Sequence, residues 1–122
     1  MERQVIKIGR WIVDCLFADD KYDVDGVLAC VWDAGAKYSV LKKAKEIMTS
    51  EQMNTGFTYN NPDNHRAVIV IDPSESGEEF IDTLVHEVHH LAVAIADGLG
   101  VDLEGETPAY IAGDSARALA KI

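Results

Sequence analysis

The chain has 122 residues, of which 48% are hydrophobic, and its formal net charge is −10. This length suits one domain, residues 1–122, with one core. Residues 67–116 contain eleven Asp or Glu and no Lys or Arg, so they repel a phosphate backbone and exclude nucleic acid as a partner. We also find no secretory signal or membrane-spanning run, and we therefore expect a soluble, cytoplasmic protein without a membrane partner.

The first part of the chain predicts two strands followed by two helices. Residues 5–8 and 10–17 are apolar and partly alternating, which is typical of strands. A helix is expected to start after Asp23 or Asp25 and to end at about Ala34. Ser39 is expected to cap a second helix that runs to about Met48 and has one apolar and one lysine-rich face.

The rest of the chain predicts a hairpin and then two more helices. Residues 54–59 and 67–71 read as paired strands joined by a turn rich in Asn, Pro and Asp. Ser74 or Ser76 is expected to cap a long helix with an apolar stripe, and a last helix starts at Glu106 or Thr107 and ends at Leu119. Strands, helices, strands and helices in this order indicate an α+β domain, with a small, mostly antiparallel sheet packed on the long helix.

The two cysteines, Cys15 and Cys30, both lie in apolar surroundings and form no CxxC pair. We expect both to be buried free thiols.

One motif carries chemistry: residues 86–90 read His-Glu-Val-His-His and fit the pattern H-E-x-x-H. His86 and His90 are four residues apart within the predicted long helix, so they share a face and can bind one zinc ion. Glu87 is placed to take a proton from a metal-bound water, as a general base. His89 faces about 100° away from His90, and we expect it to lie at the surface or behind the ligands.

A catalytic zinc needs a third protein ligand, and no further histidine follows His90. Glu106 opens the last helix, where Ala109 and Tyr110 could pack it against the motif helix, so we expect Glu106 to be that ligand. Glu104 is the alternative, and Asp102 a further one.

These residues resemble the gluzincins, and more narrowly the small metallopeptidases encoded in bacteriophage and prophage genomes. The resemblance covers about residues 54–119 and rests on Asn54-Thr55-Gly56-Phe57-Thr58, the apolar strand 67–71, the H-E-x-x-H motif and the later Glu106-x-x-Ala109-Tyr110. It implies a minimal zincin-like domain in which two His and one Glu bind Zn²⁺ and the Glu of the motif is catalytic.

Three functions remain open. The first is a zinc metallopeptidase acting on a peptide or protein, in which the strand 67–71 pairs with an extended substrate. For this peptidase, Tyr110 could also donate a hydrogen bond to the oxyanion, but we interpret it as a core residue. The second is a phage or mobile-element protein for assembly or host interaction that keeps a zinc without peptidase activity. The third is a zinc hydrolase acting on another amide, such as a cell-wall fragment. The sequence leaves the oligomeric state open.

Overall fold

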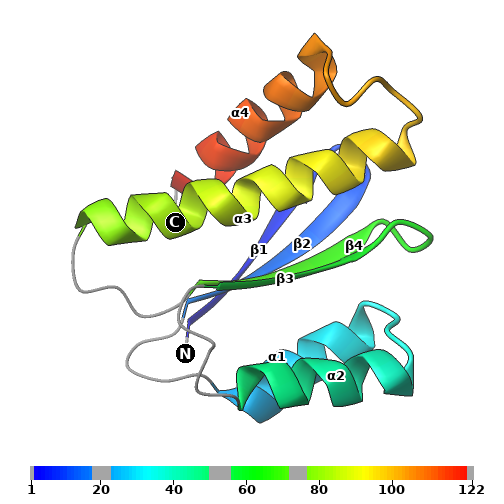
Figure 1. Ribbon diagram of the computed structural model, residues 1–122, viewed down its shortest axis with the longest axis vertical. Coiled ribbons are helices and arrows are strands. Elements are labelled where there is room, and N and C mark those ends of the chain that lie inside the picture. The colour runs from blue at the N-terminus through cyan, green and yellow to red at the C-terminus, as the bar shows by residue number, and fades with distance from the viewer. Residues whose placement is uncertain (1, 18–22, 50–55, 72–76, 121–122) are drawn as a thin grey trace.

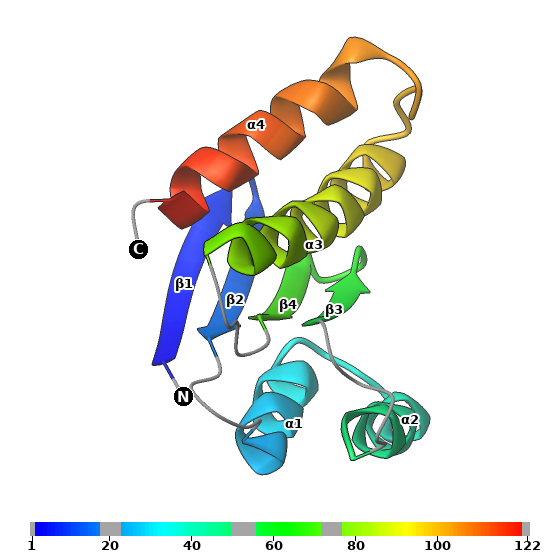
Figure 2. The ribbon, with the colours of Figure 1, turned by 60° about the vertical axis from the view of Figure 1, so that its left-hand side comes forward.

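The computed structural model describes residues 2–17, 23–49, 56–71 and 77–120, which form three layers (Figure 1). A four-stranded sheet lies in the middle. Helices α3 and α4 cover one of its faces, and α1 and α2 cover the other (Figure 2). The predicted α+β class and the mostly antiparallel sheet are confirmed. Among the described residues, no helix combines the length and the apolar character that crossing a bilayer requires.

Two hairpins supply the strands. Strands β1 (Glu2–Ile8) and β2 (Trp11–Phe17) pair antiparallel across a two-residue loop. The first loop residue, Gly9, has a φ of +59°, a left-handed conformation that glycine adopts without steric cost. Strands β3 (Gly56–Asn61) and β4 (Arg66–Ile71) form the second predicted hairpin.

The order of the strands is β1-β2-β4-β3, with β4 parallel to β2 and antiparallel to β3. Both sides of β4 are therefore already paired, and the prediction that residues 67–71 pair with a substrate is wrong. The continuous apolar run of this strand reflects burial on both faces. In the described sheet, β3 is the edge strand nearest to α3.

The helices begin and end close to the predicted residues. Helix α1 (Val24–Asp33) is capped by Asp23, whose carboxylate accepts from the Gly26 amide at 3.1 Å. Helix α2 (Tyr38–Met48) starts two residues earlier than expected, with Lys37 at the cap position, so Ser39 lies inside its first turn and is not the cap. Helices α3 (Gly77–Gly98) and α4 (Glu106–Ala120) follow. The predicted caps of α3, Ser74 and Ser76, lie outside the described residues.

Alternation along the strands divides the buried side chains into two cores. Val13, Cys15 and Ile69 point toward α3 and α4, where they meet the predicted apolar stripe of α3. Their strand neighbours Leu16 and Val68 point toward α1 and α2. Cys15 and Cys30 are both buried and unbridged, as predicted.

Candidate metal centre

Helix α3 places His86 and His90 one above the other on its surface. Their Nε2 atoms are 3.2 Å apart, and the two ring planes meet at 81°. Both rings are exposed, the His86 side chain to 62%. Helical spacing alone predicts that the two residues share a face, and the structure adds that their Nε2 atoms lie within hydrogen-bond distance of each other.

This spacing fits a metal ion. Two nitrogens bound to one tetrahedral zinc at about 2.0 Å lie about 3.3 Å apart. The distance between the two Nε2 atoms of His86 and His90 is therefore one that two ligands of a single zinc would also have. Because both imidazoles reach solvent, an ion can enter from the surface.

Glu87 lies next to this pair but is buried, with 2% of its surface exposed. Its Oε2 accepts a hydrogen bond from the Thr58 hydroxyl on the edge strand β3. Its Oε1 lies 4.0 Å from Nε2 of His86. One oxygen of the carboxylate is thus held by the sheet while the other faces the histidine pair.

Thr58 enters the sequence-based argument only as part of the resemblance, and its contact with Glu87 was not predicted. Side chains alternate along a strand, so Thr58 turns to the α3 face while Phe57 and Tyr59 turn to the α2 face. A threonine between two aromatic residues of a strand predicts that its hydroxyl lies on the opposite face of the sheet from the two rings. Its partner, 29 residues away in the chain, could not be read from that pattern.

The two flanks of α3 have different surroundings. Successive helical residues are about 100° apart, so His90 lies between Glu87 and His86, on the flank toward β3. Val85 and His89 lie on the other flank, where they line a hollow together with Ala112 and Ala116 of α4. His89 is exposed, as expected, and it lies away from the His86–His90 pair.

The structure does not bring Glu106 to the histidine pair. Helix α4 begins near the C-terminal end of α3 and runs back along it (Figures 1 and 2), on the flank that carries His89. Within the described ranges, no three His, Cys, Asp or Glu side chains gather closely enough to hold an ion between them. In the described part of the chain, His86 and His90 are therefore not joined by a third such side chain.

The buried face of α4 explains this placement. Ser115 and Leu119 are buried and Ile111 is partly buried, and these residues, four apart, form one stripe against the sheet. Tyr110 lies about 100° from that stripe and is 70% exposed, so the interpretation as a core tyrosine is wrong. Ala109 is exposed as well and does not pack Glu106 against α3.

The alternative ligands lie in the connection between α3 and α4. Glu104 is exposed, and its backbone amide donates to the Asp102 carboxylate at 3.0 Å. That bond stabilises the turn before α4 and explains the local role of Asp102.

Comparisons of the chain with protein-family models, with curated proteins and with solved structures give no match. The functional argument therefore rests on the residues of this site and on their geometry.

Proposed function

We propose that the protein is a metal-dependent hydrolase of peptides, with His86 and His90 as metal ligands and Glu87 as the general base. One observation carries the proposal: two imidazole nitrogens lie 3.2 Å apart beside a buried carboxylate, one oxygen of which is 4.0 Å from Nε2 of His86. A structural histidine pair on a helix surface does not require a buried acid at its side.

The roles of the residues follow from their contacts. A bound Zn²⁺ would supply an acidic water and polarise the scissile carbonyl. Glu87 accepts the proton at Oε1 and later returns it to the leaving amine. Thr58 holds Oε2, so that the carboxylate cannot turn away from the histidines.

The edge strand supports a peptide as the substrate. Strand β3 contributes Thr58 to the site, and its outer side is not paired by any described strand. An extended peptide that adds to β3 runs past the same flank of α3 that carries His86 and His90. This replaces residues 67–71, which are internal, as the strand that receives the substrate.

The first experiment measures metal content and cleavage together. Protein purified with ample zinc is analysed for metals and incubated with a mixed library of peptides and peptidoglycan fragments. We expect zinc binding and peptide cleavage, both lost in His86→Ala and both kept in His89→Ala, the matched control on the other flank. Zinc without any cleavage would favour the assembly or host-interaction alternative, and cleavage of peptidoglycan fragments alone would favour the cell-wall one.

The third ligand remains a prediction. If Glu106 is the ligand, as the sequence predicts, Glu106→Ala must lose zinc to a moderate chelator while Glu104→Ala keeps it, because a lost ligand weakens affinity far more than a lost neighbouring charge. Since the structure leaves Glu106 apart from His86 and His90, we expect equal, small effects of the two substitutions instead. The reverse ranking would assign the role to Glu104. Equal, small effects would show that the histidine pair takes its third ligand from elsewhere.

A further inference from the structure

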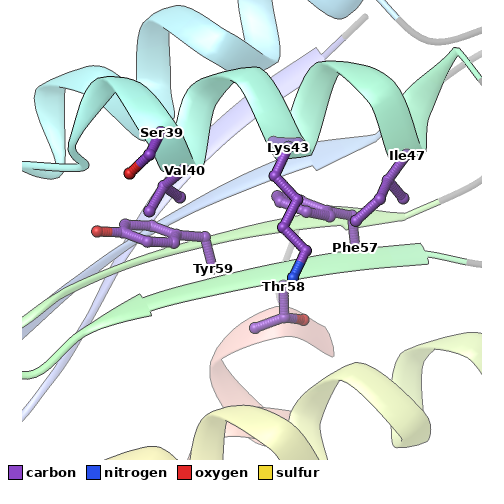
Figure 3. A pocket seen from close by; sticks show the side chains of 8 residues that line it. Ser39, Val40, Lys43, Ile47, Phe57, Thr58 and Tyr59 are labelled. Atoms are coloured by element: carbon purple, nitrogen blue, oxygen red, sulfur yellow. The ribbon is translucent and has the colours of Figure 1, made fainter.

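A groove with a volume of about 330 Å³ lies between α2 and the edge strand β3, on the face of the sheet opposite α3. Its walls are mainly apolar and come from both elements: Val40, Ala44, Ile47, Phe57 and Tyr59. Figure 3 shows Phe57 and Tyr59 turned toward α2, whereas Thr58 points to the other side of the strand. The groove and the histidine pair therefore lie on the two sides of one strand.

This arrangement matters for any peptide that adds to β3. Neighbouring side chains of an extended peptide point to opposite faces of the sheet. One set would point to the α3 face, beside His86 and His90, and the next set would point into the groove. A single bound peptide can thus contact both sites at once.

The charge around the groove is unusual for this chain. Helix α2 carries Lys42, Lys43 and Lys45 with Glu46 as its one acidic residue, while the whole chain has a net charge of −10. Lys43 lines the groove and extends from α2 toward β3 (Figure 3). An acidic side chain on a bound peptide meets an attractive charge here, in contrast to the acidic residues 67–116.

We propose that this groove is a side-chain subsite for the substrate: it takes a large apolar side chain of a peptide bound along β3, and Lys43 favours an acidic residue on the same face. The inference rests on the proposed function, since it names the substrate class of the same hydrolase. Ile47, 42% exposed, forms the outer apolar wall.

The experiment measures binding without cleavage. The full chain with Glu87→Gln is titrated against a fluorescein-labelled peptide, Thr-Glu-Thr-Phe-Thr-Glu-Thr, in which Phe and both Glu fall on one face of a strand. We expect replacing Phe by Ala to weaken binding about tenfold, because a buried aromatic side chain is lost. Replacing both Glu by Gln should weaken it by about threefold.

Protein variants locate the contacts. Lys43→Glu should weaken binding about fivefold and remove the preference for Glu over Gln, whereas the matched variant Lys42→Glu, on the same helix but outside the groove, should change it less than about twofold. Ile47→Ser should reduce the preference for Phe over Ala. Equal effects of Lys43→Glu and Lys42→Glu, or no preference for Phe, would overturn the proposal.

Two other roles of this face predict different results. If β3 pairs with β3 of a second copy, sedimentation will show a dimer that the peptide does not dissociate. If Lys43 serves only to prevent other chains from pairing with the exposed edge of β3, the Lys43→Ala variant will self-associate. The peptides with Phe and with Ala will then bind equally well. Either result overturns the subsite. Selective binding by a protein that proves to lack zinc and cleavage would instead refute the hydrolase and leave a peptide-binding groove.

Discussion

Among the described residues, one buried carboxylate lies on each face of the sheet, and the two have different hydrogen-bond partners. Asp14, fully buried on the α1 and α2 face, accepts from Arg3 at 2.8 and 3.1 Å and from Arg66 at 3.4 Å. Glu87, on the α3 face, accepts from the neutral hydroxyl of Thr58. In the described part of the chain, no Lys or Arg forms an ion pair with Glu87.

Under the proposed function, this difference separates a carboxylate that stabilises the fold, Asp14, from one that takes part in the reaction, Glu87. Two guanidinium groups on β1 and β4 neutralise Asp14 and occupy both of its oxygens, and the hydrogen bond to Asp14 raises the pKa of Arg3. Asp14 therefore stabilises the sheet, and both of its oxygens already accept hydrogen bonds from within the protein. Glu87 keeps one oxygen available beside two imidazoles, as a group that must accept a proton needs.

The largest effect is expected from Glu87→Gln. The amide keeps an oxygen for the Thr58 hydroxyl but cannot accept a proton, so hydrolysis should fall by roughly a thousandfold. Zinc content and the free energy of unfolding should stay close to those of the native protein. Cleavage at the native rate would show that Glu87 is structural like Asp14 and would end the distinction between the two faces.

Asp14→Asn should have the opposite profile. The substitution leaves two guanidinium groups without their counter-charge, so the free energy of unfolding should fall by about 2–4 kcal/mol. We expect a smaller loss than for a fully buried ion pair, because both arginines can reach solvent. Denaturant unfolding measures this loss. Arg3→Ala is the matched control, and since Arg3 is half exposed and Arg66 remains, it should cost about 1 kcal/mol.

Thr58 tests how Glu87 is held. Thr58→Val keeps the shape of the side chain and removes the hydroxyl, so we expect kcat to fall about tenfold and the unfolding free energy to fall by about 1–2 kcal/mol, because a buried acceptor loses its partner. Thr58→Ser restores the hydroxyl and should restore kcat. Equal losses in both variants would mean that packing of the methyl group, and not the hydrogen bond, is what matters.

The smallest effect at neutral pH is expected for the two thiols. Cys15 lies in the core beneath α3 and α4, and Cys30 lies in the core beneath α1 and α2. Burial raises the pKa of Cys15 from 9.0 to about 12, and burial also raises that of Cys30. Both should resist a thiol reagent at pH 8 until the protein unfolds. In the unfolded chain the Cys15 thiol ionises above about pH 9, whereas in the folded protein it stays neutral up to about pH 12. The free energy of unfolding should therefore be unaffected by this group below pH 9 and should fall as the pH rises from 9 to 12, by about 1 kcal/mol at pH 10. Cys15→Ala should remove that part of the alkaline dependence, and an unchanged dependence would contradict it.

The sequence by itself determined the local elements and the pairing of His86 with His90 on one face of a helix. Hydrophobic periodicity located both hairpins and all four described helices, and the four-residue spacing of His86 and His90 determined that they share a face. These features depend on neighbours within one or two turns of helix or one strand pairing, where side-chain direction follows from backbone geometry alone. The turn at Gly9 is of the same kind.

The tertiary structure alone decided which segments meet. It placed β4 inside the sheet and β3 at its edge, and it packed α4 on the flank of α3 away from His86 and His90, leaving Glu106 apart and Tyr110 exposed. It also joined Thr58 to Glu87 and Asp14 to Arg66, which are 29 and 52 residues apart. Such contacts depend on strand order and helix packing, for which many arrangements satisfy the same local pattern and only the burial of the whole chain selects one.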